Sequence, residues 1–368
     1  MNKKKGVKIC FVSLNSYPLF QRKSKGYFGG AELQMSLIAK QLAKDPRFRV
    51  SVITRDYGQK RVIKKNGITL YRCFHKRFHG LIELAEAFVT ALMINADVYV
   101  GRTSNNMINL MALFCKIFNK KLIYMAAHDW DAQPNVYNKK TNINRRLFYQ
   151  GLKRVNLIIS QSKNQQKMFK ENLGLLSIIM PSIIKLKKSK RVKKTIILWV
   201  GRADYWKRPV SFLRLTQALP AEKFVMICRK GSDVKLFNRV ESLAKKLDNV
   251  KFFSAVSIEE IIRFFNQAKI FVNTSTVEGF PNTFMQSGLT KTPVLSLKVN
   301  PDNYLKVFNC GLTTKNSQKL LIKGCKKLLK NTKLARTMGK NHHDYIIKNH
   351  SFKNINIFKE AVCEKLLV

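Results

Sequence analysis

Short runs of β-branched or other apolar residues alternate with segments of helical periodicity along most of the chain. This alternation is typical of parallel sheets built from strand–helix–strand units, in which each crossover helix covers one face of the sheet. Residues 7–14 have the pattern of a first buried strand, and residues 31–44 place Leu33, Leu37 and Leu42 along one helical face. The pattern predicts an α/β fold, and a hydrophobic content of 45% excludes a disordered tail protein.

The same pattern starts a second time after a basic segment at residues 185–194, which holds seven Lys and Arg in ten positions. A charge run without a core face favours a solvated linker, and a nuclear-localisation or nucleic-acid patch is the alternative. We therefore predict two doubly wound domains, at residues 1–184 and 195–350, with ligands bound between the carboxyl ends of their strands. Beyond them, residues 351–368 carry an apolar stripe that a terminal helix must bury against a partner.

The charge is strongly positive and evenly spread. Lys and Arg number 69 and Asp and Glu 21, a formal net charge of +48, of which +23 lies in residues 1–184 and +25 in residues 185–368. Two explanations stay open: the residue usage of an AT-rich genome, or an anionic partner such as a membrane surface or nucleic acid.

Seven cysteines occur without a CxxC pair, several of them inside apolar runs. They are interpreted as reduced core thiols of a cytoplasmic protein. The most apolar long stretch, residues 81–100, contains Glu83, Glu86 and Asp97. We expect no membrane-spanning segment, so that contact with a membrane would be peripheral, on its inner face.

The turn from the first strand into the first helix contains Gly29 and Gly30. Small residues there would let an anion or a sugar hydroxyl approach the backbone N–H groups at the positive end of the helix. The alternative is a simple glycine turn, and the absence of GxGxxG gives no support to a dinucleotide fingerprint.

The equivalent turn of the second domain contains Gly201, Arg202 and Lys207. Two cations at this place could hold a diphosphate, Arg as a planar fork and Lys as a point charge. In so basic a chain, two incidental surface charges are the alternative.

A later strand runs into Glu278, a Gly/Pro turn and a helix. The amides from Gly279 to Thr283 would form a helix N-terminus suited to phosphate. A carboxylate beside such a site can orient sugar hydroxyls and stabilise the positive charge that develops at an anomeric carbon.

His128 follows the end of a strand in the first domain, between small residues and Asp129 and Asp131. A satisfied core histidine is the alternative to a catalytic one. We expect no metal, because no third group of ligands with suitable spacing appears and cations at Arg202 and Lys207 could neutralise phosphate.

Together these stretches resemble family 4 of the glycosyltransferases, the retaining "glycosyl transferases group 1" enzymes of GT-B architecture. The resemblance covers nearly the whole chain, and its strongest part is Gly201-Arg202 with Lys207 followed by the segment from Glu278 to Thr283. It implies two Rossmann-like doubly wound domains that face each other across a cleft, with the terminal helix crossing back to the first domain.

The resemblance also implies roles for individual residues. Arg202 and Lys207 would bind the diphosphate of a nucleotide sugar, Glu278 would hold its sugar hydroxyls, and His128 would lie against the transferred sugar. The expected substrate-binding residues are Gly29, Gly30, Gly201, Gly279, Phe280, Pro281, Asn282, Thr283 and Gln286. No cofactor is expected, and the acceptor would be a saccharide or a lipid-linked hydroxyl in cell-surface polysaccharide or glycolipid synthesis.

One departure from the family pattern concerns Gln286, which stands eight residues after Glu278 where the family carries a second Glu that usually reaches the nucleotide ribose. An amide can bond a ribose hydroxyl, but without the assistance of a charge. The main alternative function is therefore a catalytically degenerate GT-B protein that binds polyanions or membrane. A nucleotide-sugar epimerase of the same architecture is a third, against which the turn at Glu278 argues.

Overall fold

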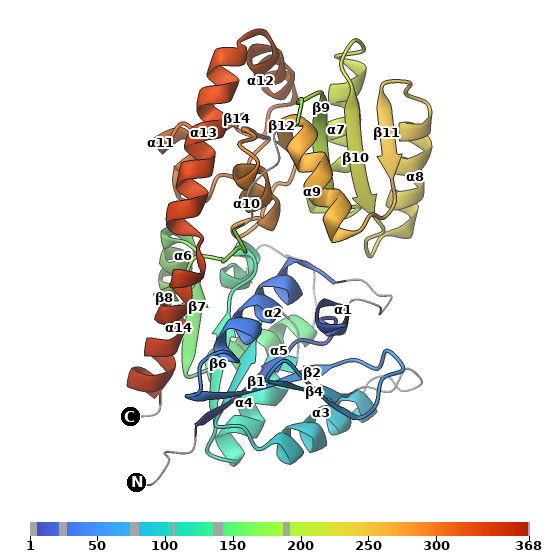
Figure 1. Cartoon of the computed structure of the whole chain (residues 1–368). Coiled ribbons are helices and arrows are strands. Elements are labelled where there is room, and N and C mark those ends of the chain that lie inside the picture. The colour runs from blue at the N-terminus through green and yellow to red at the C-terminus, as the bar shows by residue number, and fades with distance from the viewer. Residues whose placement is uncertain are drawn as a thin grey trace. The chain divides into compact units, whose positions relative to one another are not determined.

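A computed structural model describes residues 6–21, 28–73, 81–102, 104, 107–134, 143–186 and 192–366 (Figure 1). The chain divides into two compact units. Unit 1 comprises residues 1–183 and 352–368, and unit 2 comprises residues 184–351. Half of the basic segment that was interpreted as a linker, residues 187–191, lies outside the described residues. No helix of the described part has both the length and the apolar character needed to cross a bilayer.

Unit 1 is built on an eight-stranded sheet in the order β3-β4-β2-β1-β5-β6-β7-β8. All neighbouring strands are parallel except the edge pair β3–β4. The strands are β1 (Val7–Val12), β2 (Phe48–Thr54), β3 (Val62–Lys65), β4 (Ile68–Arg72), β5 (Val98–Gly101), β6 (Lys121–Met125), β7 (Leu157–Ser160) and β8 (Ile178–Ile179). The helices are α1 (Tyr17–Phe20), α2 (Gly30–Leu42), α3 (Leu81–Ile94), α4 (Met107–Ile117), α5 (Ile143–Leu152) and α6 (Lys163–Leu173).

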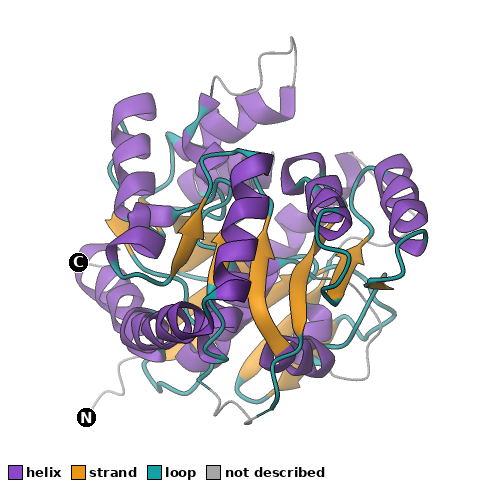
Figure 2. Ribbon diagram, turned by 90° about the horizontal axis from the view of Figure 1, so that it is seen from above, coloured by secondary structure: helices purple, strands orange, loops and turns teal. Residues whose placement is uncertain are grey.

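Helices pack against both faces of this sheet, and Figure 2 shows helices on both sides of the strands. Successive side chains of a strand point to opposite faces, so Ile9 and Phe11 of β1 join one core, and Cys10 and Val12 join another. The first core includes α2, and the second includes α3 and α4. Burial on both faces explains why these strands are continuously apolar in the sequence.

The terminal helix α14 (Ile355–Glu360) and the π-helical turn Ala361–Leu366 belong to unit 1. Their apolar stripe is buried in the core beneath α2, where the rings of Phe358 and Phe11 stack at a centroid distance of 6.2 Å. Lys359 forms an ion pair with Asp45 at 2.7 Å. The last residues of the chain therefore complete the core that the first residues begin.

Unit 2 contains a fully parallel sheet in the order β11-β10-β9-β12-β13-β14. Its strands are β9 (Ile196–Arg202), β10 (Phe224–Arg229), β11 (Val250–Phe253), β12 (Ala268–Asn273), β13 (Val294–Ser296) and β14 (Gly311–Thr313). Its helices are α7 (Pro209–Gln217), α8 (Val234–Lys245), α9 (Ile258–Gln267), α10 (Asn282–Leu289), α11 (Tyr304–Val307), α12 (Gln318–Lys330) and α13 (Thr332–Asn349). The prediction of two doubly wound domains is confirmed.

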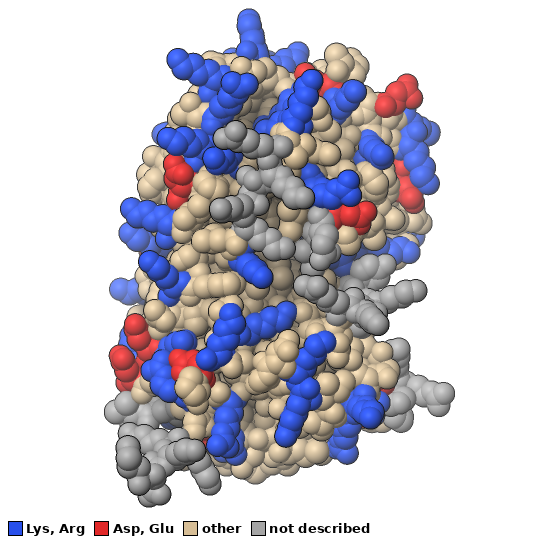
Figure 3. Space-filling view, viewed as in Figure 1, with Lys and Arg blue, Asp and Glu red and all other residues tan. Residues whose placement is uncertain are grey.

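The cysteines and the charges lie as the sequence indicates. All seven cysteines are free, six are buried and Cys363 is partly buried. Basic side chains are scattered over the face of the molecule in Figure 3 and greatly outnumber the acidic ones.

Candidate functional site

The candidate site of unit 2 lies where the strand order reverses. From β9 the chain moves to β10 on one side of the sheet, and it later returns to place β12 on the other side of β9. Ligands of doubly wound sheets bind at such a switch point, outside the carboxyl ends of the strands. Arg202 is the last residue of β9, Lys207 ends the 3-10 turn Tyr205–Lys207, and Glu278 follows β12.

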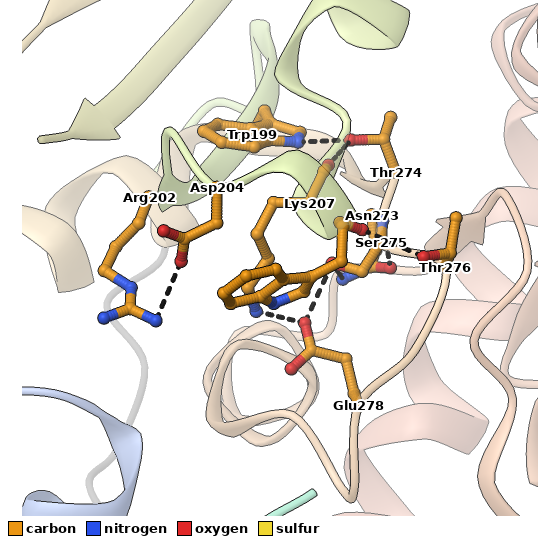
Figure 4. A network of polar contacts seen from close by, with 10 residues as sticks. Trp199, Arg202, Asp204, Lys207, Asn273, Thr274, Ser275, Thr276 and Glu278 are labelled. Atoms are coloured by element: carbon orange, nitrogen blue, oxygen red, sulfur yellow. Dashed lines mark hydrogen bonds and ion pairs between the residues drawn. The ribbon is translucent and has the colours of Figure 1, made fainter. Parts of the chain in front are cut away.

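Lys207 and Glu278 form an ion pair (Figure 4). The Nζ of Lys207 donates to Oε1 of Glu278, and the same oxygen accepts a hydrogen bond from the Ser275 hydroxyl at 2.8 Å. Both side chains are mostly buried, with 21% of Lys207 and 11% of Glu278 exposed. Two predicted site residues that stand 71 positions apart in the sequence therefore meet directly.

Three hydrogen bonds fix the turn of Lys207 to the segment after β12. The indole of Trp199 donates to the Thr274 hydroxyl at 2.9 Å, and this hydroxyl donates to the Lys207 carbonyl at 2.6 Å. The Thr276 amide donates to the Trp206 carbonyl at 2.8 Å. These bonds hold the cation and the acid in a preformed arrangement, which the sequence does not indicate because Thr and Trp carry no signal of this kind.

Arg202 pairs with Asp204, at 2.8 Å between Nη2 and Oδ2. Half of the Arg202 side chain is exposed, whereas Asp204 is buried. Gly231 packs against this acid, since a Cβ at position 231 would lie 2.4 Å from Oδ1 of Asp204. Asp204 thus orients the guanidinium. No sequence motif indicates this role, although Asp204 stands only two residues after Arg202.

The turn after Glu278 opens α10. Pro281 is the N-cap residue, so the first amides of the helix belong to Asn282 and Thr283. The Phe280 side chain is buried, with its ring 4.1 Å from that of His350. Phe280 can therefore serve a ligand only with its backbone. Gly279 is buried, Gln286 is partly buried on α10, and Gly201 lies in β9, where a Cβ would meet the Trp199 ring at 2.7 Å.

In unit 1, Gly29 is the N-cap of α2 and Gly30 is the first residue of that helix. The Gly29 amide donates to Oε2 of Glu32 at 2.8 Å. A Cβ at Gly29 would lie 2.8 Å from the same oxygen, so the capping contact by itself favours glycine.

His128 is the N-cap of a 3-10 turn, Asp129–Ala132. Its Nδ1 accepts from the Trp130 amide at 3.4 Å, and its ring lies 4.7 Å from the Trp130 ring. The buried Asp131 accepts from the amides of Ala127 and His128 at 2.8 and 3.0 Å. An amide donating to Nδ1 places the ring proton on Nε2. Across the described ranges, no three His, Cys, Asp or Glu side chains gather as metal ligands would.

Comparisons with known proteins show what the chain is similar to. Residues 182–344 match the family model "Glycosyl transferases group 1". A Campylobacter jejuni protein, GalNAc-alpha-(1->4)-GalNAc-alpha-(1->3)-diNAcBac-PP-undecaprenol alpha-1,4-N-acetyl-D-galactosaminyltransferase, is 24% identical over 70% of this chain and 73% of its own length.

Solved structures share the fold over the full length. Sucrose-phosphate synthase from Thermosynechococcus elongatus superposes with a TM-score of 0.79 at 17% identity, covering 98% of this chain and 99% of that one. WaaG, a glycosyltransferase involved in lipopolysaccharide biosynthesis, superposes with a TM-score of 0.72 at 16% identity, covering 97% and 100%. Residues 182–344 therefore match a group 1 glycosyltransferase domain, and the chain as a whole shares the GT-B fold of these glycosyltransferases.

Proposed function

We propose that this glycosyltransferase moves a hexose-type sugar from a nucleotide diphosphate donor to a hydroxyl acceptor with retention of the anomeric configuration and without a metal. The observation that carries the proposal is the pair of Lys207 and Glu278 at the switch point of unit 2. A cation suited to phosphate and an acid suited to sugar hydroxyls already lie side by side there, beside the first turn of α10.

The pair can serve both halves of the donor. The Lys207 ammonium has three N–H donors, so one can stay with Glu278 while another reaches the diphosphate. The exposed Arg202 fork, oriented by Asp204, would bind the same diphosphate. Glu278 would accept bonds from sugar hydroxyls and stabilise the charge that develops at the anomeric carbon.

In the proposed reaction the bond from the anomeric carbon to the phosphate oxygen breaks, and a bond to the acceptor oxygen forms on the same face. The acceptor proton passes to the leaving diphosphate, whose charge Arg202 and Lys207 neutralise. His128 would lie against the transferred sugar. Gly29 and Gly30 would border the donor phosphate and the acceptor. This scheme rests on the family resemblance for its stereochemistry.

For the acceptor we propose a saccharide or lipid-linked hydroxyl in cell-surface polysaccharide or glycolipid synthesis. The name of the Campylobacter relative describes a saccharide on PP-undecaprenol, which supports a lipid-linked acceptor.

We also propose peripheral binding to an anionic membrane on the cytoplasmic side. It is supported by the charge of +48 and by exposed apolar residues on α3 and α4, namely Ile82, Val89, Met93, Leu113 and Ile117.

A nucleotide-sugar screen tests the transfer reaction. The protein is incubated in EDTA with UDP-, GDP-, ADP- and TDP-sugars, and release of the nucleoside diphosphate is measured together with thermal stabilisation by each free diphosphate. We expect one nucleotide to stabilise the protein and its sugar to be hydrolysed slowly without acceptor. Stabilisation by polyanions such as heparin, with no response to any nucleoside diphosphate, would favour the degenerate binding protein instead.

A further inference from the structure

Two buried polar side chains of unit 1 lack partners at one place on its sheet. Arg102 directly follows β5, is 4% exposed, and its Nε forms no hydrogen bond with any residue in the described ranges. Ser13 directly follows β1, is 5% exposed, and its Oγ is likewise without a partner there. Buried polar groups are nearly always bonded, so each of these needs an explanation.

The two residues occupy corresponding positions. β1 and β5 are parallel neighbours whose last matched residues are Val12 and Gly101, so Ser13 and Arg102 each stand one residue beyond that pair. The sheet order reverses at the same place, since β1 leads to β2 on one side and β5 lies on the other. This is the switch point of unit 1, where doubly wound sheets bind ligands.

The acids near Arg102 are engaged elsewhere. Glu32 accepts from the Gly29 amide and Asp131 accepts from two amides, and no ion pair joins either acid to Arg102 within the described part of the chain. Burial lowers the pKa of Arg102 to about 10, opposed by the charges of Tyr124, Asp131 and Glu32. The guanidinium therefore stays charged at neutral pH.

We propose that Arg102, assisted by the Ser13 hydroxyl, binds an anionic group, a carboxylate or a phosphate, carried by the acceptor. A guanidinium offers a planar fork of N–H donors that matches both groups, and a hydroxyl adds one more donor. The assignment to the acceptor rests on the proposed function, in which the donor diphosphate belongs to Arg202 and Lys207 of unit 2. The inference is that this transferase acts on an acidic saccharide or a phosphorylated one.

A purely structural role for Arg102 makes the opposite prediction about stability. If the cation only neutralised Glu32 and Asp131, its replacement would destabilise the protein. If it is held ready for a ligand, a neutral side chain at the same place relieves an uncompensated buried charge. Arg102→Gln should therefore leave the melting temperature of the ligand-free full chain unchanged or higher.

The experiment titrates the full chain, at constant ionic strength, with galacturonate, galactose 6-phosphate and methyl galactoside. Thermal stabilisation and calorimetric binding are measured for the wild type, Arg102→Gln, Ser13→Ala and the control Arg49→Gln, which removes the same charge from an exposed position on β2. We expect the wild type and the control to bind an anionic probe in preference to the neutral sugar. Arg102→Gln should lose at least tenfold in affinity and Ser13→Ala less. The galacturonate and phosphate arms show which anion is preferred.

Unchanged binding in Arg102→Gln would overturn the proposal, as would a lowered melting temperature with no binding of either anion by the wild type. Binding of nucleoside diphosphates is measured on the same four proteins. If none of the four proteins binds a nucleoside diphosphate but anion binding still depends on Arg102, the proposed transfer reaction is wrong and the anion site stands. The anion would then no longer be assigned to an acceptor. If nucleoside diphosphates bind but Arg102→Gln does not change anion binding, the anion site is wrong and the proposed transfer reaction is unaffected.

Discussion

The ammonium of Lys207 donates to the carboxylate of Glu278 across 71 positions of sequence. The contact links the turn after β9 to the turn after β12, and the carboxylate also accepts a bond from Ser275. In the absence of a ligand each charge therefore compensates the other. In the proposed reaction, a donor would find the cation and the acid already oriented, so little reorganisation would be required when charge develops.

Glu278→Ala is expected to abolish most transfer. Loss of a stabilising carboxylate should raise the barrier by about 3 kcal/mol, or lower the rate roughly a hundredfold. Because Glu278 is also bonded to Lys207 and Ser275, Glu278→Gln is the milder companion variant. Steady-state rates with the donor from the nucleotide screen measure the effect.

The matched control is Glu222→Ala, which removes another ion pair of unit 2, that with Lys269 at 2.8 Å. Its activity should stay close to that of the wild type. Near-normal transfer by a folded Glu278→Ala protein would exclude this residue from the site.

Arg202→Ala should weaken binding of the free nucleoside diphosphate as well as that of the donor, because its proposed contact is with phosphate. The loss should be about 1.5 to 3 kcal/mol, the usual range for a charged hydrogen bond. Calorimetry against the diphosphate measures it, with Arg239→Ala on the exposed side of α8 as the control. Equal affinities for the two variants would contradict the assignment.

Gln286→Glu should tighten binding of the nucleotide by about 1 kcal/mol, near fivefold, because a charged hydrogen bond to ribose replaces a neutral one. The gain should shrink for the 2'-deoxy nucleotide, since the added charge acts only through the ribose hydroxyls. Dissociation constants of the two nucleotides for both proteins provide the test. No change, or an equal fall for both nucleotides, would show that Gln286 does not contact the ribose.

The main lines of the fold could be predicted because strands buried on both faces are continuously apolar. The strand predicted at residues 7–14 corresponds to β1 (Val7–Val12), for example. The edge strand β3 was missed. β3 alternates exposed and partly buried residues, so it lacks an apolar run, and only the Asn66-Gly67 turn, with both residues at positive φ, indicates it.

The candidate site was likewise only partly predictable from the sequence. Motif positions indicated Arg202, Lys207 and Glu278, whereas their partners Asp204 and Ser275 depend on contacts that only the folded chain creates. Arg102 was not singled out at all. One arginine among 69 basic residues carries no signal in the sequence. Its unusual character comes from burial with an Nε that has no hydrogen-bond partner among the described residues.

Anionic vesicles should bind the protein at low salt and release it as ionic strength rises. Each exposed Lys or Arg near such a surface contributes about 1 kcal/mol and is screened over about a Debye length. Sedimentation with vesicles of phosphatidylserine and phosphatidylcholine measures this. Ile117→Asp on α4 should reduce binding more than Val307→Asp in unit 2, although the two residues are almost equally exposed, at 66% and 65%. No binding at low salt would leave residue usage of the genome as the explanation of the charge.

His342 should make unit 2 sensitive to acid. This residue of α13 is fully buried, with Nδ1 3.0 Å from the Thr292 carbonyl and Nε2 3.3 Å from the Tyr304 hydroxyl. Burial lowers its pKa to about 4, with a smaller contribution from His343 and an opposing one from the Thr292 carbonyl. Between the ordinary value of 6.5 and about 4, the unfolded chain therefore binds a proton that the folded chain does not. The free energy of unfolding should therefore decrease as the pH is lowered through this window.

The full loss attributable to His342 is about 3 kcal/mol, since each pH unit corresponds to about 1.4 kcal/mol. Urea unfolding gives the free energy of unfolding at pH 7 and pH 4.5. Because other groups titrate over the same range, the change between the two pH values is compared between the wild type and variants. In His342→Gln the pH-dependent loss should be smaller than in the wild type, even though the variant is less stable at pH 7. His343→Gln, the same change at the neighbouring and only partly buried position, should keep the wild-type pH dependence. Parallel pH profiles for the wild type and His342→Gln would show that the buried imidazole does not govern acid unfolding.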